Sequence, residues 1–250
     1  MKIDNIKLDI IFDNKHCNNT KESLWGFSCL IQTPNNTILF DTGSNGRVLL
    51  KNIKSRGLDI NNIDTVFISH SHWDHIGGID SILEINSNID IFLTSSLSKN
   101  LIRDLKTLSK KVEVIEENPI EILPNIYSTG AMGNEKEQAL IIDTDRGLII
   151  VAGCSHSGIA NIALRAKEFL GKKIFLLLGG FHLYKKSEKE IWEVIDTIKN
   201  KIDTQFIAPS HCTGNRAIEL FQSRFKQNYI SSGMGIHINF QQNHINNYCF

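Results

Sequence analysis

Short apolar runs separated by polar turns recur along the chain, and their lengths are typical of β-strands. They predict strands at 6–12, 26–32, 37–40, 64–70, 90–93, 112–115, 126–128, 138–143, 147–152, 173–178 and 205–208. A Pro-Asn-Asn sequence between the second and third runs indicates a hairpin turn. The strands therefore fall into two β-rich halves.

Apolar residues at helical spacing lie between and after these strands, and they predict helices at 47–54, 76–83, 96–108, 159–170, 187–200 and 216–225. The fifth of these helices opens with a capping box, Ser187-Glu-Lys-Glu190. Helices flanking two β-rich halves predict an α/β (α+β) fold, a four-layer αββα sandwich with two sheets packed face to face. In such a sandwich the strand ends of both halves share one edge, where their loops can form a common site.

Composition limits the number of domains, the kinds of partner and the location that we expect. No linker or low-complexity tract divides the 250 residues, which predicts a single domain over 1–250. The 27 basic side chains balance 27 acidic ones, so we expect neither a nucleic-acid nor a membrane partner. No apolar run is long enough for a signal peptide or a membrane span. Five scattered cysteines predict reduced thiols in a cytoplasmic protein: Cys17, Cys29, Cys154, Cys212 and Cys249.

The strongest chemical signal comes directly after the predicted strand at 64–70. His70 and His72 are two residues apart, so in an extended segment their side chains project the same way and can hold one metal ion. Asp74 and His75 lie past the bend and can face a second ion. Two divalent ions about 3.5–4 Å apart would hold a bridging hydroxide as the nucleophile. Such a cluster rarely arises in an ordinary surface loop.

The run at 70–75 is similar to the signature of the metallo-β-lactamase superfamily, and Phe-Asp-Thr-Gly at 40–43 looks like its first motif. This resemblance implies the metallo-β-lactamase fold and a metallohydrolase acting on a small-molecule substrate. It implies that Asp41 supports the histidine loop, with a plain Asp-Thr-Gly turn as the alternative. Two divalent ions are expected, zinc first, with Mn or Fe as alternatives.

The superfamily usually has a further metal-binding histidine in a Gly-His-Thr motif, which this chain lacks. No histidine lies between His75 and His156, and Gly-Cys-Ser-His at 153–156 is the candidate replacement. We predict that His156 is a ligand of the first ion. Cys154 lies near the position of a bridging Asp or a Cys ligand in relatives, so it can contribute a thiolate, although a buried structural cysteine is an equal alternative.

Two later histidines end predicted strands. His211 lies in a motif that resembles the superfamily's last one, whose histidine binds the second ion, and we assign it there with Asp74 and His75. His182 is a candidate substrate-binding group, proton donor or replacement ligand, with a structural core histidine as the alternative. Asp74 and His182 are the predicted catalytic residues. Surface or structural positions are expected for the remaining histidines named here: His16, His237 and His244.

Taken together from 25 to 235, the motifs resemble one branch of the superfamily, the 7,8-dihydropterin-6-yl-methyl-4-(β-D-ribofuranosyl)aminobenzene 5′-phosphate synthases. We expect hydrolysis of a phosphate ester, lactone or related substrate, with a synthase-type displacement of pyrophosphate as one alternative. A non-catalytic metal-containing ligand-binding or sensor module is the other. Phosphate would be favoured by cationic groups near the site, for which Lys185, Lys186 and Arg216 are candidates, with solvated surface charge as the alternative.

A redox di-iron protein is disfavoured because such relatives usually have a carboxylate where His72 stands, and because the chain has no room for a flavin domain. Nucleases of this fold normally need an inserted domain or an RNA-gripping arm, and neither is present. Glyoxalase-type thioesterase activity is disfavoured by the missing Gly-His-Thr motif.

Overall fold

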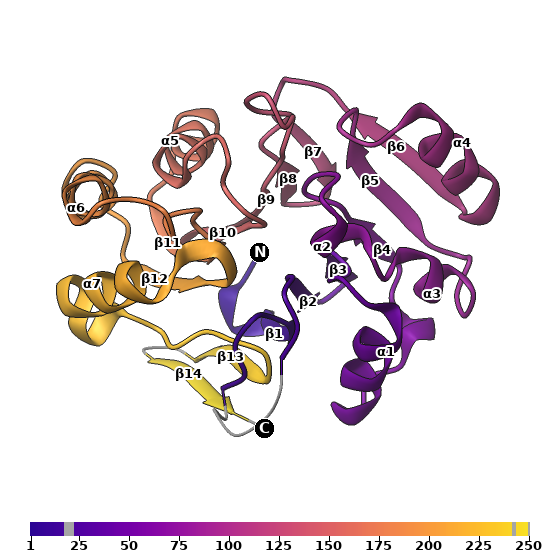
Figure 1. Ribbon diagram of the computed structural model, residues 1–250, viewed down its shortest axis with the longest axis horizontal. Coiled ribbons are helices and arrows are strands. Elements are labelled where there is room, and N and C mark those ends of the chain that lie inside the picture. Colours follow the sequence, from indigo (N-terminus) through magenta and orange to yellow (C-terminus); the bar gives the residue numbers. More distant parts are fainter. Residues whose placement is uncertain (18–22, 242–243, 250) are drawn as a thin grey trace.

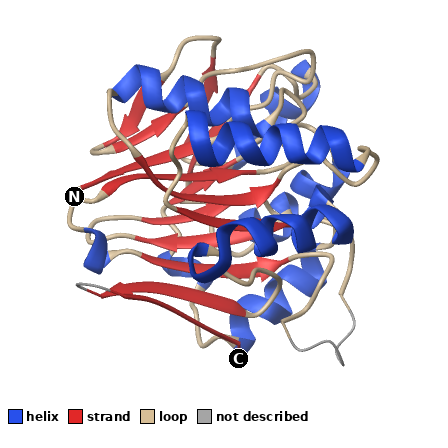
Figure 2. Cartoon of the chain, turned by 90° about the vertical axis from the view of Figure 1, so that its left-hand side faces the viewer, coloured by secondary structure: helices blue, strands red, loops and turns tan. Residues whose placement is uncertain are grey.

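The molecule is built in four layers, two β-sheets face to face with helices on the outer side of each (Figures 1 and 2). This computed structural model describes residues 1–17, 23–241 and 244–249. In Figure 1, α5, α6 and α7 cover one sheet, and α1, α3 and α4 cover the other. The predicted αββα sandwich is therefore confirmed.

The first sheet has eight strands in the order β14-β13-β1-β2-β3-β4-β5-β6. Strands β3 to β6 are parallel, so their carboxyl ends lie at one edge. The strands of this sheet are β1 (Lys7–Phe12), β2 (Ser28–Gln32), β3 (Thr37–Phe40), β4 (Thr65–Phe67), β5 (Asp90–Thr94), β6 (Lys111–Ile115), β13 (Ile236–Gln241) and β14 (His244–Cys249). The helices in this half of the chain are α1 (Gly46–Ser55), α2 (Trp73–Ile76), α3 (Ile79–Leu83) and α4 (Lys99–Leu108).

The second sheet has six strands in the order β12-β11-β10-β9-β8-β7. Strands β10, β11 and β12 are parallel, and they read as almost uninterrupted apolar runs because both of their faces are buried. The bounds are β7 (Ile120–Leu123), β8 (Ile126–Ser128), β9 (Leu140–Thr144), β10 (Gly147–Ala152), β11 (Ile174–Gly180), β12 (Phe206–Ser210), α5 (Ile159–Leu170), α6 (Glu188–Asp196) and α7 (Asn215–Phe225).

Three apolar clusters hold these layers together. One fills the space between the sheets, where Phe40 stacks on Phe67 with ring centroids 5.4 Å apart. The second packs α5, α6 and α7 against the six-stranded sheet, and the third packs α1, α3 and α4 against the eight-stranded one. Burial of these faces is the main force that fixes the strand ends relative to one another.

Most predicted elements are confirmed, and the differences have local causes. The helix expected at 76–83 is divided into α2 and α3 by a Gly-Gly pair, and that expected at 187–200 ends as α6 before a π-helical turn, Thr197–Lys201. Ser187 forms the predicted capping box with Glu190. Strand β7 and the hairpin β13–β14 were not predicted, although β13 pairs with β1 and extends the first sheet.

The cysteine interpretation is corrected in part. Cys17 and Cys249 form a disulfide bond, so the expectation of five reduced thiols is wrong; Cys29, Cys154 and Cys212 are free and buried. The cytoplasmic location thereby loses one of its supports and stays a prediction. In the part of the chain described here, no helix has the length and apolar character needed to cross a membrane.

Candidate metal centre

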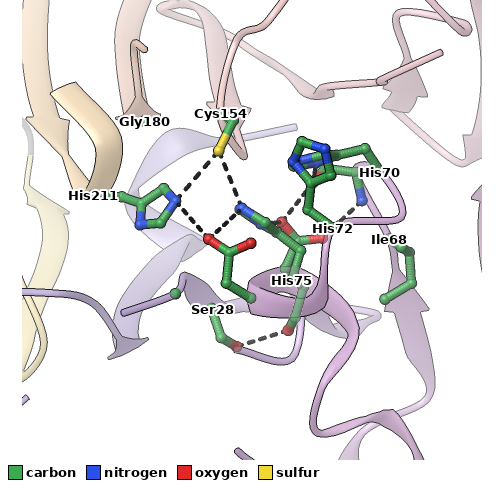
Figure 3. Close-up of polar contacts among 12 residues, drawn as sticks. Ser28, Ile68, His70, His72, His75, Cys154, Gly180 and His211 are labelled. Carbon is green, nitrogen blue, oxygen red and sulfur yellow. Dashed lines mark hydrogen bonds and ion pairs between the residues drawn. The ribbon is translucent and has the colours of Figure 1, made fainter. Parts of the chain in front are cut away.

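The predicted metal-binding side chains come from both sheets and meet at the carboxyl ends of their strands. The 70–75 run follows β4 of the first sheet, whereas the 153–156 loop follows β10 and His211 follows β12 of the second (Figure 3). Parallel strands place their carboxyl ends at the same edge, which is why loops far apart in the chain can share one site. All seven predicted ligands lie there: His70, His72, Asp74, His75, Cys154, His156 and His211.

Three imidazoles form the first candidate ligand set. The ligand atoms of His70, His72 and His156 all lie within 4.8 Å of one another, and Nε2 of His70 is 3.0 Å from Nδ1 of His72. Burial lowers the pKa of His70, and burial together with the neighbouring His182 and His72 lowers the pKa of His156 to about 4. These two rings are therefore neutral at pH 7, the state that binds metal.

A buried atom without a partner shows that this set fits a metal ion. Nε2 of His156 is buried, and no described group forms a hydrogen bond with it. Burying a polar atom without a partner costs free energy. Three histidine nitrogens are a common ligand set for zinc, and a bound ion would satisfy this atom.

The second ligand set surrounds the carboxylate of Asp74. Its Oδ2 lies 3.6 Å from Nε2 of His75 and 3.4 Å from Nε2 of His211. The sulfur of Cys154 lies 3.2 Å and 3.3 Å from the same two nitrogens, and Figure 3 shows Cys154, His75 and His211 directed toward one another. Cys154 is thus inside the cluster, which favours a metal-ligand role over a purely structural one.

The carboxylate of Asp74 carries a negative charge within this second set. Burial would raise its pKa, but the hydrogen bond with His211 and the charges of His75 and His211 outweigh it and lower the pKa to about 2. The carboxylate is therefore ionised at neutral pH. Two nitrogens, one oxygen and one sulfur form a donor set that suits zinc and other borderline-soft ions.

The position of Cys154 predicts a spectroscopic result. When Co²⁺ replaces the native metal, the wild-type protein is expected to show a sulfur-to-cobalt charge-transfer band, which Cys154→Ser abolishes because no thiolate remains in the set. Absorption titration with Co²⁺ measures this. Cys29→Ser is the matched control, because Cys29 is also free and buried but lies on β2, outside the ligand sets. A band that survives in Cys154→Ser would contradict the assignment.

Asp41 contacts the histidine loop as the sequence indicated. It is fully buried, and its carboxylate accepts hydrogen bonds from the backbone N–H and hydroxyl of Ser69, each at 2.7 Å. Oδ2 is also 2.7 Å from Nδ1 of His75, and the hydroxyl of Ser69 is 2.9 Å from Nδ1 of His70. One carboxylate therefore orients a ring in each ligand set, directly for His75 and through Ser69 for His70.

His182 lies at the edge of the first set. Its ring centroid is 4.3 Å from that of His156, and its ligand atom lies within 4.8 Å of those of Cys154 and His156. Contact with Cys212 raises the pKa of His182, and its Nδ1 is buried without a hydrogen-bond partner among the described residues. The ring is near enough to the predicted metal ligands to act on a bound substrate.

Backbone strain is concentrated at this edge. Four non-glycine residues of the site have positive φ: Asp41 at 53°, Ser155 at 64°, His182 at 51° and His211 at 48°. Such conformations cost free energy and are kept where the surrounding structure enforces them, typically at functional sites. Gly180 allows the strands to approach this closely, because a Cβ there would lie 2.3 Å from the backbone oxygen of Gly153.

Two supporting residues were missed by the sequence analysis. Oδ1 of Asn14 lies 2.9 Å from Nδ1 of His211, and its Nδ2 donates to the backbone oxygen of His211. Glu137 accepts hydrogen bonds from the backbone N–H groups of Ser155 and Ser157, both at 2.8 Å, and so fixes the loop that carries His156. Neither has a local sequence signal, because their partners lie far along the chain or in another loop.

The burial of Glu137 predicts a pH dependence of stability. Burial raises its pKa from 4.5 to about 7, although hydrogen bonds from Ser157 and Ser155 oppose the shift. Between these values the folded chain keeps a proton that the unfolded chain releases, so the free energy of unfolding falls as pH rises. We expect the metal-free wild type to lose about 2 to 3 kcal/mol more than Glu137→Gln between about pH 5 and about pH 8. Urea denaturation at both pH values measures this difference. An equal change in the free energy of unfolding for the wild type and Glu137→Gln would contradict it.

The structure disfavours phosphate binding for two of the three cationic candidates. Lys186 pairs with Glu190 at 2.9 Å, and Arg216 pairs with Glu188 at 2.7 Å. These two side chains are surface charges already matched by carboxylates, which favours the solvated-surface alternative. Nζ of Lys185 instead lies over the ring of Tyr184, 5.2 Å from its centroid.

The histidines outside the site have the surface or structural surroundings expected of them. His237 is buried, and its Nδ1 is 3.0 Å from Oδ1 of Asp9 on the neighbouring strand β1. His16 is half-buried beside Cys17. The side chain of His244 lies outside the described part of the structure.

Known proteins resemble this chain in both sequence and structure. The model of the metallo-beta-lactamase superfamily matches residues 26–92. A 7,8-dihydropterin-6-methyl-4-(beta-D-ribofuranosyl)-aminobenzene-5'-phosphate synthase of Methanocaldococcus jannaschii is 30% identical, over 91% of this chain and 94% of its own. The crystal structure of a metal-dependent hydrolase of the beta-lactamase superfamily superposes with a TM-score of 0.78 at 28% identity, covering 95% of this chain and all of that one (100%). A Bacillus subtilis metallo-beta-lactamase fold protein, 16% identical with a TM-score of 0.67, covers 93% of this chain and 98% of its own and shares the fold.

Proposed function

Because this chain belongs to the metallo-β-lactamase superfamily, we propose that it is a metal-dependent hydrolase with two adjoining metal sites. The observation that carries the proposal is the pair of ligand sets at one sheet edge. His70, His72 and His156 form one, and the second consists of Asp74, His75, Cys154 and His211. Redox-inert zinc suits both donor sets, with Mn or Fe as alternatives.

The chemistry of the donor atoms supports two divalent ions. When bound, they would act as Lewis acids toward the substrate and lower the pKa of water at the site. The orphaned Nε2 of His156 and the ionised carboxylate of Asp74 both fit such ions. Asp41 and Asn14 would keep the ligand rings oriented, in the way that outer partners of metal-binding histidines do.

The two catalytic residues have different roles in this proposal. Asp74 is the carboxylate of the second ligand set, where its negative charge would hold metal and orient water. His182 lies beside His156, and its contact with Cys212 raises its pKa, which favours a role as proton donor to a leaving group. It follows β11 with a positive φ of 51°, and its ring lies against that of His156.

The substrate class proposed is a small phosphate ester, lactone or related compound. The solved structure at 28% identity is a metal-dependent hydrolase, which supports hydrolysis as the reaction type. The relative at 30% identity is named as a synthase, which supports a transferase that displaces pyrophosphate as the second candidate. Both reactions place developing negative charge on a leaving group next to the same ligands.

Turnover by the metal-loaded protein tests this proposal. Protein loaded with Zn²⁺ or Mn²⁺ is offered bis(p-nitrophenyl) phosphate, a γ-lactone, or a pterin pyrophosphate with an aminobenzene acceptor. We expect hydrolysis of one of the first two, its loss on chelation, and its recovery when metal is returned. Pyrophosphate release that requires the acceptor, without hydrolysis, would assign the transferase instead. Full metal occupancy without turnover on any substrate would indicate a binding or sensor module.

A further inference from the structure

A band of aromatic rings borders the metal ligands on the solvent side. Trp25 and Tyr184 meet edge to face at 6.3 Å, Tyr184 lies 5.5 Å from His182, and His182 lies 4.3 Å from His156. The ring of Trp25 is also 5.3 Å from that of His211. This ring band therefore runs from the second ligand set to the first.

The two outer rings of the band are exposed. Trp25 is 46% exposed and Tyr184 is 45% exposed, whereas the side chain of His211 beneath Trp25 is fully buried. Aromatic surface of this size is normally stabilised by burial. Exposed aromatic groups next to a cluster of convergent polar groups are typical of ligand sites.

The loop that carries Trp25 is fixed to the metal centre. The N–H of Gly26 donates to Oδ1 of Asn14, which also contacts His211, and the N–H of Phe27 donates to the backbone oxygen of Asp74. Gly26 has a φ of 142°, and a Cβ there would lie 2.6 Å from that same oxygen of Asp74. The position of Trp25 is thus determined by the ligand loops themselves.

Tyr184 is held from the opposite side. Gly214 has a φ of 85°, and a Cβ added to it would lie 2.7 Å from Cα of Tyr184. The chain after His211 therefore packs directly under Tyr184. The ammonium group of Lys185 lies over the ring of Tyr184, 5.2 Å from its centroid.

We propose that Trp25 and Tyr184 form a stacking wall that binds the planar aryl group of an aryl phosphate ester, with its phosphate directed to the metal centre. This inference rests on the proposed function and specifies its substrate. Aromatic rings bind planar groups by offset or edge-to-face contact, which adds affinity beyond that of the buried area alone. The ammonium of Lys185 adds a positive charge beside the wall, which favours an anionic ester.

Calorimetry on the zinc-loaded protein tests the wall with two probes, phenyl phosphate and methyl phosphate. We expect phenyl phosphate to bind about fivefold to tenfold more tightly. Trp25→Ala and Tyr184→Leu should each reduce this preference, and Trp25→Phe should restore it. The matched control is Leu24→Ala, which removes an equally exposed side chain of the same loop and should leave the preference unchanged.

The outcomes separate the wall from the hydrolase. Equal affinity for the two probes, or a preference that persists in both Trp25→Ala and Tyr184→Leu, would overturn the wall even if both esters are hydrolysed. A preference that depends on these rings, in a protein that hydrolyses neither these esters nor the phosphodiester and lactone of the turnover test, would retain the wall and contradict the hydrolase. Circular dichroism of each variant confirms that the fold is kept.

Discussion

Asp74→Ala is expected to lower the hydrolytic rate by about 10³-fold or more, because it removes several kcal/mol of metal-dependent stabilisation from the transition state. Asp74 is the carboxylate of the second ligand set, with its Oδ2 3.4 Å and 3.6 Å from ring nitrogens of His211 and His75. The measurement is steady-state hydrolysis at saturating Zn²⁺, with bound metal determined in parallel.

A control separates this loss from an effect of charge alone. Asp80 is an exposed carboxylate in the following helix α3, so Asp80→Ala removes the same charge outside the ligand sets. Its rate should equal that of the wild type. Retention of more than about a tenth of the wild-type rate by Asp74→Ala would contradict the assignment of Asp74.

Asp41→Ala is expected to weaken both metal binding and the fold. Its carboxylate accepts two hydrogen bonds from Ser69 and contacts Nδ1 of His75, all in a fully buried position. Removing it leaves these donors unsatisfied, at a cost of about 3–5 kcal/mol in the free energy of unfolding. Metal affinity should fall by about 10- to 100-fold, because the ligand rings lose their outer partner.

The matched variant for this prediction is Asp41→Asn, which retains an acceptor oxygen but loses the charge. We expect its free energy of unfolding, from urea denaturation, and its zinc affinity, from competitive titration, to lie between those of the wild type and Asp41→Ala. If Asp41→Ala binds zinc as tightly as the wild type, Asp41 is only a turn residue, as a plain Asp-Thr-Gly sequence would be.

The part of the site that was predictable is local in sequence. His70, His72, Asp74 and His75 lie within six consecutive positions, and their spacing after an apolar strand carries the geometry by itself. His156 and His211 also follow apolar strands, so the sandwich architecture was enough to bring them to the same edge. The placement of Cys154 needed the structure, because spacing alone does not say which side of a turn faces the cluster.

The missed features depend on contacts between distant segments. Asn14 reaches His211 across 197 positions, and Glu137 reaches Ser155 across 18. A single asparagine or glutamate has no periodicity or motif that would distinguish it from a surface residue. Pairing of β13 with β1 likewise joins the two ends of the chain. The disulfide of Cys17 with Cys249 follows from the same closure, which an odd cysteine count does not predict.

Pairing of surface charges also depends on the structure. Lys186 precedes the N-cap Ser187, so its ion pair with Glu190 lies outside the helix to which the i,i+4 rule applies. Arg216 meets Glu188 from a different helix, across the contact between α6 and α7. Only the structure therefore shows that the charge of Arg216 is already matched.

Anomalous diffraction at the zinc edge, from crystals of the zinc-loaded protein, tests the two-set metal centre most directly. We predict two anomalous peaks. One should lie among His70, His72 and His156, and the other among the atoms that converge on Asp74, which include the sulfur of Cys154. A single peak, or a peak away from these side chains, would contradict the two-set metal centre.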